Sequence, residues 1–164
     1  MNAGAYESEI ESKVLRCATV DRCGNTLIRD RAQMGFGYRT SALMSNGEIV
    51  TDIFLRLCAG EAEAIRERME RTLSRRKASQ PLDFPSAGSV FKRPSHDYAG
   101  RLIECCGLKG AREGGAQVSE KHAGFIINTG NATADDVMRL IDMIQNKVYI
   151  QTGVRLETEI KFIA

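Results

Sequence analysis

The sequence predicts an α+β fold. Residues 62–73 and 137–148 carry apolar side chains at three- and four-residue spacing, which is typical of amphipathic helices. Short apolar or alternating segments, among them 14–21 and 154–162, are typical of strands. Strands and helices follow one another without the βαβ rhythm of a parallel sheet, and no dinucleotide-binding glycine motif is present. Antiparallel sheet with helices is therefore the expected architecture.

The N-terminal part of the chain is expected to be antiparallel β-structure. Residues 14–21 and 26–30 are predicted strands, with Gly24 in the hairpin turn between them. A third strand is predicted over 48–57, after an Asn-Gly turn. Four of its apolar residues share one parity, which predicts a single buried face. These residues are Ile49, Ile53, Leu55 and Leu57.

A helix is predicted to begin after Gly60 and to end before Pro81. Its apolar stripe consists of Ala62, Ile65, Met69 and Leu73. The opposite face is charged and solvated. The three cations at residues 75–77 complement the negative end of the helix dipole.

The last third of the chain contains the best-defined helix, over 133–151. Thr133 and Asp136 have the spacing of a capping box, and Gly153 provides a C-terminal stop. The expected core stripe is Val137, Leu140, Ile141, Ile144 and Val148. A short helix over 98–106 ending at Gly107 and a strand over 124–128 come before it, and an alternating strand over 154–162 follows.

Composition excludes several classes of protein. The 164 residues carry a net charge of only +2, which argues against a nucleic-acid binder. Five cysteines without Cys-x-x-Cys spacing and two histidines offer no metal set, so no metal is expected and the cysteines are interpreted as reduced. No apolar segment has the length of a signal or membrane span, and a cytoplasmic protein without a membrane partner is expected.

The loop over 85–94 is the most informative segment. Prolines restrict both of its ends, Gly88 permits a tight turn, and Ser89 is followed closely by Lys92 and Arg93. By itself this pattern describes a surface loop with incidental charges. Its interpretation changes when it is read together with two distant residues, Arg39 and Glu159.

An ordered set of motifs includes these three residues. It runs through Asn-Ala-Gly-Ala-Tyr at 2–6, Phe-Gly-Tyr-Arg-Thr-Ser at 36–41, the 85–94 loop, Ala-Gly-Arg-Leu-Ile-Glu at 99–104, Gly-Leu-Lys-Gly at 107–110, Gly-Gly-Ala-Gln-Val-Ser at 114–119, 120–128 and 156–163. In this order the motifs resemble the bacterial flavoenzyme family UDP-N-acetylenolpyruvoylglucosamine reductase. The resemblance covers nearly the whole chain. The short connection between Ser41 and Ile49 is similar to the branch of the family that lacks an extra loop.

The resemblance implies a division of the chain into two parts. Residues 1–58 would be the C-terminal part of a flavin-binding domain, and residues 59–164 a small α+β substrate-binding and catalytic domain. Members of the family carry a further flavin-binding region, with a Gly-Ser-Asn phosphate loop, before the motif at 2–6. We therefore expect a truncated chain that binds FAD weakly or not at all. Apolar surface exposed on 1–58 and self-association through it are also expected.

The resemblance implies a reduction of UDP-N-acetylglucosamine enolpyruvate to UDP-N-acetylmuramate, with NADPH and FAD, in peptidoglycan synthesis. Arg39 would be the cation at the enolate, Glu159 its partner or a protonated acid, and Ser89 the proton donor. Each has a simpler interpretation: Arg39 as a surface residue, Ser89 as a turn residue, and Glu159 as an exposed ion-pair partner of Lys161 or Arg155.

Further contacts are implied by motif position. The cofactor-binding residues would be Asn2, Ala3, Gly4, Ala5 and Tyr6. The residues contacting the nucleotide-sugar substrate would be Tyr38, Lys77, Arg93 and His122. Glu7 stands where the family usually has glycine, which places the local turn in question. Lys77 could equally be a helix-end cation, and His122 a structural residue.

Two other functions remain open. The chain could be a non-catalytic module that binds a UDP-sugar, which a flavin absorbance spectrum would distinguish from an enzyme. It could also be an RNA-binding or scaffold protein that uses the cations near residues 75–77 and 92–93. With 6% aromatic residues and no tryptophan, the chain offers few stacking platforms for RNA, which ranks that function last.

Overall fold

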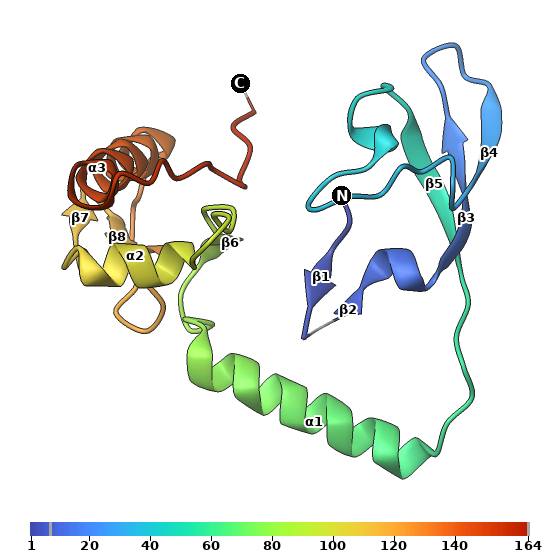
Figure 1. Cartoon of the computed structure of the whole chain (residues 1–164), viewed down its shortest axis with the longest axis horizontal. Coiled ribbons are helices and arrows are strands. Elements are labelled where there is room, and N and C mark those ends of the chain that lie inside the picture. Colours follow the sequence, from blue (N-terminus) through green and yellow to red (C-terminus); the bar gives the residue numbers. More distant parts are fainter. Residues whose placement is uncertain (7, 164) are drawn as a thin grey trace. The chain divides into compact units, whose positions relative to one another are not determined.

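The computed structural model describes residues 1–6 and 8–163 and divides into two compact units (Figure 1). The first unit is Met1–Glu61 and the second is Ala62–Ala164. Each unit has an antiparallel sheet, and helices accompany the sheet of the second unit, so the predicted α+β class is confirmed. Glu7, whose effect on the opening motif was questioned, lies outside the described residues.

The first unit is a three-stranded antiparallel sheet in the order β4–β3–β5 (Figure 1). These strands are β3 (Val14–Val20), β4 (Thr26–Asp30) and β5 (Ile49–Leu55), close to the predicted ranges. The carboxylate of Asp21 accepts hydrogen bonds from the backbone N–H groups of Cys23 and Asn25, which closes the predicted hairpin. Two short strands, β1 (Gly4–Ala5) and β2 (Ser8–Glu9), pair with each other. The unit also contains the single helical turns η1 (Ile10–Ser12) and η2 (Ala42–Met44).

The predicted buried face of β5 is wrong for the described residues. Every residue of β5 is exposed, and Ile49 and Ile53 are 70% and 52% exposed. The two-residue period shows which side chains share a face, but burial also requires a layer that covers this face. β5 lies at an edge of a three-stranded sheet, and apolar surface is exposed on it as expected for residues 1–58.

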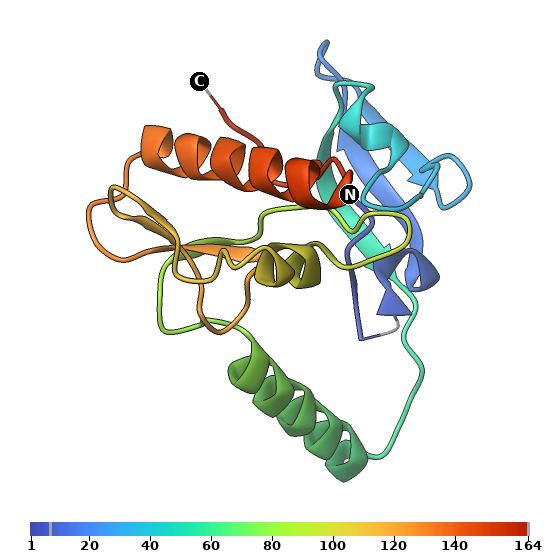
Figure 2. The same cartoon turned by 60° about the vertical axis from the view of Figure 1, so that its left-hand side comes forward.

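The second unit contains a four-stranded antiparallel sheet in the order β6–β9–β8–β7. The strands are β6 (Ser86–Ser89), β7 (Arg112–Glu113), β8 (Ala116–Val118) and β9 (Phe125–Asn128), and the helices are α1 (Ala62–Ser79), α2 (Ala99–Cys105) and α3 (Ala134–Thr152). Helix α3 packs across β7 and β8 and against α2 (Figure 2). The core includes Ile103, Val118, Leu140, Ile144 and Val148, so the predicted stripe of α3 is confirmed.

Both ends of α3 are formed as predicted. Thr133 and Asp136 make the reciprocal bonds of a capping box, and Gly153 ends the helix with a φ of 72°. The pKa of Asp136 is lowered by its hydrogen bonds with Thr133 and by neighbouring donors. The β7–β8 hairpin lies very close to the segment before the N-terminus of α3. A Cβ on Gly115 would lie 2.4 Å from the carbonyl oxygen of Gly130.

Two other predictions require correction. Residues 154–162 contain no strand but an isolated bridge of Thr158 with Phe91, because a strand needs a partner along its whole length. The stripe of α1 is not buried: Met69 is 67% and Leu73 is 50% exposed. No described helix is long and apolar enough to span a membrane.

Candidate functional site

Ser89 lies at the exposed end of β6. The pairing of β6 with β9 is irregular between Ser86 and Ser89, where Gly88 has a φ of 85°. This φ is open to glycine but strained for residues with a Cβ. Val90 follows in the core, 1% exposed, and its N–H donates to the carbonyl of Gly124 at 2.9 Å. The bulge therefore presents the Ser89 hydroxyl at the surface while the next residue anchors the backbone.

Glu159 lies beside this loop, although it is far from it in the sequence. Its N–H donates to the carbonyl of Val90 at 2.7 Å, and the N–H of Lys92 donates to the carbonyl of Glu157 at 2.8 Å. Glu159 is half-buried. The tertiary structure thus brings together Ser89 and Glu159, two of the three residues expected to be catalytic.

His122 approaches the same loop from the turn before β9. Its ring nitrogen Nδ1 accepts a hydrogen bond from the N–H of Gly124 at 3.1 Å, so in the neutral ring Nε2 carries the hydrogen. A Cβ on Gly124 would lie 3.0 Å from Cε1 of His122 and 3.6 Å from Oγ of Ser89. Gly124 is therefore the close-packed point between the two predicted site residues.

The predicted cations lie on exposed parts of the second unit. The guanidinium of Arg93 stacks on the ring of Tyr98, 4.0 Å from its centroid. Lys77 is exposed in the last turn of α1, and its carbonyl accepts a bond from Nζ of Lys121 at 2.5 Å. Sequence reasoning missed Tyr98 and Lys121. For Lys121, the only signal was its place immediately before His122.

Asp97 and Arg101 hold the beginning of α2 next to Tyr98. Arg101 makes an ion pair with Asp97, whose carboxylate also accepts from the N–H of Tyr98 at 2.7 Å. These bonds, first of all those from Arg101, lower the pKa of Asp97 to about 2. The hydrogen bonds and the charge of Asp97 in turn raise the pKa of Arg101. Tyr98, which stacks on Arg93, is therefore fixed at the N-terminus of this helix.

In the first unit, Arg39 lies against the opening motif. It has a φ of 54°, and its guanidinium stands over the ring of Tyr38 at 5.3 Å. Its Nη1 is 3.4 Å from the position that a Cβ on Gly4 would take. The structure thus brings together two segments expected to form the site, the loop with Arg39 and residues 2–6.

Asn2 has a structural place within that motif. It is fully buried, and its amide donates to Glu9 at 2.7 Å while its oxygen accepts from the N–H of Glu11 at 3.2 Å. A side chain at Gly4 would approach Cγ of Glu9 to 3.1 Å. Ala3, Ala5 and Tyr6 are exposed. Those three, and not the buried Asn2, are the residues of the motif whose side chains are open to a ligand.

These residues fit the ring system of a flavin better than the diphosphate of FAD. The exposed Ala3, Ala5 and Tyr6, with the Arg39 cation near Gly4, suit one wall of a flat, electron-accepting ring. The diphosphate of FAD needs backbone donors, commonly at a helix N-terminus. The helical elements described in Met1–Glu61 are only the single turns η1 and η2.

Among the described residues, no three His, Cys, Asp or Glu side chains are grouped to hold a metal ion.

Comparison with known proteins decides the family. A family model described as "UDP-N-acetylenolpyruvoylglucosamine reductase, C-terminal domain" matches residues 80–163, half of the chain. The chain belongs to this family. The matched residues include Ser89, Arg93, His122 and Glu159.

Relatives in this reductase family align along nearly the whole chain. The UDP-N-acetylenolpyruvoylglucosamine reductase of Caldanaerobacter subterraneus subsp. tengcongensis is 52% identical over 99% of this chain and 54% of its own length. That of Clostridium botulinum strain Hall is 46% identical over 99% of this chain and 53% of its own length. The chain therefore spans about half the length of the curated relatives it matches.

A solved structure of the family has the same fold. The UDP-N-acetylenolpyruvylglucosamine reductase of Thermus caldophilus superimposes with a TM-score of 0.87 at 37% identity. The superposition covers 98% of this chain and 57% of that chain. The resemblance inferred from the sequence motifs is therefore confirmed at the level of family and fold.

Proposed function

We propose that this chain carries out, as part of a reductase of this family, the reduction of UDP-N-acetylglucosamine enolpyruvate to UDP-N-acetylmuramate in peptidoglycan synthesis. When bound, FAD that NADPH has reduced supplies a hydride to the enolpyruvyl double bond. The observation that supports the proposal is the backbone pairing of Glu159 with Val90, the residue that follows the exposed Ser89.

Ser89 is the proposed proton donor. After hydride transfer to one carbon of the double bond, the neighbouring carbon holds an electron pair conjugated with the carboxylate, and it needs a proton. Ser89 Oγ gives up this proton to form the new C–H bond, and its exposed oxygen regains one from water. The bulge at Gly88 keeps the hydroxyl clear of the core, which supports this role.

Arg39 is the proposed cation that stabilises the enolate, and Glu159 is its proposed partner. Negative charge builds up on the substrate carboxylate before the proton arrives, and a fixed cation lowers the energy of that state. Arg39 supplies the cation. Glu159 acts as its partner, and its backbone is bonded to Val90, the residue after Ser89. The fixed backbone of both residues, by a left-handed turn at Arg39 and a strand-like pair at Glu159, supports these roles.

The remaining site residues are proposed as substrate and cofactor contacts. Lys77 and Arg93 are exposed cations that suit the diphosphate of a nucleotide sugar. His122 and Tyr38 would make polar contacts to the same substrate. Residues 2–6 would line the flavin, as part of a flavin-binding region over 1–58, with 59–164 as the substrate-binding domain.

A chimaera tests this function. This chain would replace the matching part of the Caldanaerobacter relative, to which it is 52% identical. We expect the chimaera to bind FAD, to oxidise NADPH and to reduce the enolpyruvyl substrate. A chimaera that binds FAD and oxidises NADPH, but leaves the enolpyruvyl group unreduced while still binding the nucleotide sugar, would favour the alternative, a non-catalytic UDP-sugar-binding module.

A further inference from the structure

We propose that Glu48 is a positioning residue for Arg39: its partly buried ion pair with Arg29 closes the base of the loop that carries Arg39 and holds this loop in one conformation. This loop, residues 31–48 between β4 and β5, is named the Arg39 loop. The inference rests on the role proposed for Arg39 and adds two residues that no sequence motif indicated.

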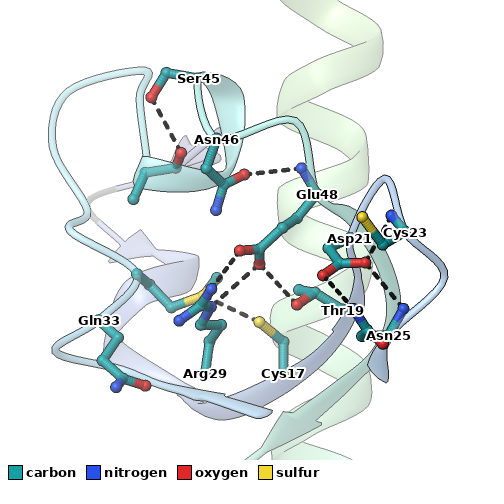
Figure 3. Close-up of polar contacts among 12 residues, drawn as sticks. Cys17, Thr19, Asp21, Cys23, Asn25, Arg29, Gln33, Ser45, Asn46 and Glu48 are labelled. Carbon is teal, nitrogen blue, oxygen red and sulfur yellow. Dashed lines mark hydrogen bonds and ion pairs between the residues drawn. The ribbon is translucent and has the colours of Figure 1, made fainter. Parts of the chain in front are cut away.

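The carboxylate of Glu48 is the centre of a buried polar network (Figure 3). It accepts a hydrogen bond from Oγ1 of Thr19 at 2.7 Å and from Nε of Arg29 at 3.1 Å, and a second guanidinium nitrogen of Arg29 completes a two-pronged ion pair. The Glu48 side chain is only 6% exposed, and Thr19 is fully buried. Such a fork fixes the relative orientation of both groups as well as their distance.

The network keeps Glu48 charged. The hydrogen bonds from Arg29 and then Thr19 lower the pKa of Glu48, and the bond to Glu48 raises the pKa of Arg29. Close to it lies the thiol of Cys17, whose pKa is raised by burial and by the Glu48 charge. Removing Arg29 would leave the buried carboxylate of Glu48 without its counter-ion, which is strongly unfavourable.

The ion pair joins the two ends of the Arg39 loop. Arg29 lies one residue before the end of β4, and Glu48 immediately precedes β5. On the β4 side, the backbone N–H of Gln33 donates to Asp30 at 2.9 Å, and the side chain of Gln33 accepts from the N–H of Asp30 at 3.0 Å. On the β5 side, the N–H of Glu48 donates to the side-chain oxygen of Asn46 at 3.0 Å, so backbone geometry is set at both ends of the loop.

Contacts inside the loop connect this base to Arg39. Met34 is 5% exposed, its sulfur accepts a contact from the thiol of Cys17 at 3.0 Å, and its carbonyl accepts from the N–H of Ala42 at 2.8 Å. Cys17 is the cross-strand partner of Arg29, so Met34 packs next to the ion pair. Gly37 and Thr40 exchange two backbone hydrogen bonds of 3.2 Å, which encloses Arg39 in a tight turn.

Arg39 needs such support because its own backbone is strained. A φ of 54° is uncommon for a residue with a Cβ and persists when surrounding structure holds it. Its guanidinium stays near Gly4 only while the turn keeps this conformation. Release of the loop base would let Arg39 adopt ordinary backbone angles and move its cation away.

Hydrogen exchange on this chain tests the positioning role without any reaction. In Glu48→Gln, which can still accept from Thr19 but lacks the charge, amides of Gly37, Thr40 and Ala42 should exchange roughly tenfold faster, while those of β3 stay unchanged. Glu63→Gln removes one member of an exposed ion pair on α1 and serves as the control, with no change expected in the Arg39 loop. Unchanged exchange in the loop, or equal acceleration in β3, would overturn the proposal.

Arg29→Lys provides a second variant that retains the positive charge beside Glu48. A lysine lacks the planar fork, so the loop should exchange faster than in the original chain but more slowly than in Glu48→Gln. If Glu48→Gln folds poorly, the comparison of Arg29→Lys with the original chain still tests the geometric argument. A loop in Arg29→Lys that is as protected as in the original chain would contradict the geometric argument.

The chimaera separates this proposal from the proposed function. Glu48→Gln should slow reduction of the enolpyruvyl substrate, leave oxidation of NADPH unchanged, and have no further effect when Arg39→Ala is already present. An equal slowing with and without Arg39 would show that Glu48 does not act through Arg39. If Arg39→Ala itself leaves the reaction unchanged, the role proposed for Arg39 fails, while hydrogen exchange still decides whether Glu48 holds the loop.

Discussion

The N–H of Glu159 donates a hydrogen bond of 2.7 Å to the carbonyl of Val90, the residue after Ser89. One backbone bond thus places Glu159, from the C-terminal segment, against Val90 at the end of the bulge of β6. The neighbouring bond from Lys92 to Glu157 fixes the register of the pair. Because the backbone holds both residues, either side chain can be replaced with little change in the position of the other.

Ser89→Ala should separate the two halves of the reaction. In the chimaera, we expect NADPH oxidation to be unchanged and reduction of the enolpyruvyl substrate to slow by about 100- to 10,000-fold, since only protonation needs the hydroxyl. Rapid mixing with flavin absorbance times each half separately. Ser95→Ala, at an exposed serine outside β6, is the control. If Ser89→Ala slows both halves equally, Ser89 is a turn residue and not the proton donor.

Gly88→Ala should destabilise the bulge that presents Ser89. No heavy atom lies within 4 Å of a Cβ at this position, so the cost comes from the φ of 85° alone. Such strain costs about 1–2 kcal/mol for alanine. Gly88→Asn should cost less, because asparagine tolerates the left-handed region. Urea unfolding of both variants provides the measurement, and equal stability of Ala and Gly at position 88 would refute the argument.

Asp97 should make stability depend on pH in the acid range. Its pKa is lowered from 3.8 to about 2, chiefly by Arg101. A lowered carboxyl pKa gives stabilisation that is complete above the unfolded pKa and is lost as pH falls from about 4 to about 2. Asp97→Asn should flatten the urea midpoint within that window, and Asp142→Asn, at an exposed carboxylate, should not. A curve for Asp97→Asn that is as steep as that of the original chain would contradict this.

Ile144→Ala should reveal the contribution of α3 to the core. Ile144 is fully buried, and truncation of such a side chain leaves a cavity and costs about 2–5 kcal/mol. Ile150 lies on the same helix but is 81% exposed, so Ile150→Ala should change stability by less than about 0.5 kcal/mol. Chemical denaturation compares the two directly. Similar losses for both variants would show that α3 is not packed as described.

Strand β5 should mediate self-association of this chain. It is an edge strand, and its side chains are exposed, including Ile53 at 52%. Such an edge favours pairing with another chain, and a charged residue blocks it. Sedimentation at rising concentration should show association that Ile53→Lys weakens and Ile150→Lys leaves unchanged. A monomer at all concentrations would count against this prediction.

The sequence alone predicted the features that depend on near neighbours. Thr133 and Asp136 are three residues apart and cap α3 in any environment that lets the helix form, and Gly153 ends it for the same local reason. The hairpin between β3 and β4 follows from the turn residues between the strands. The stripe of Leu140, Ile141 and Ile144 follows from the helical period. The ordered motifs also identified the family.

Only the tertiary structure decided which of these features meet, and which faces are covered. The contacts of Glu159 with Val90 and of Glu48 with Arg29 have no signal in spacing, because segments that are far apart in the sequence can approach one another in many ways. The exposed apolar faces of β5 and α1 show a second feature that the sequence did not predict. Periodicity states which side chains share a face, but burial depends on a second surface that removes this face from water.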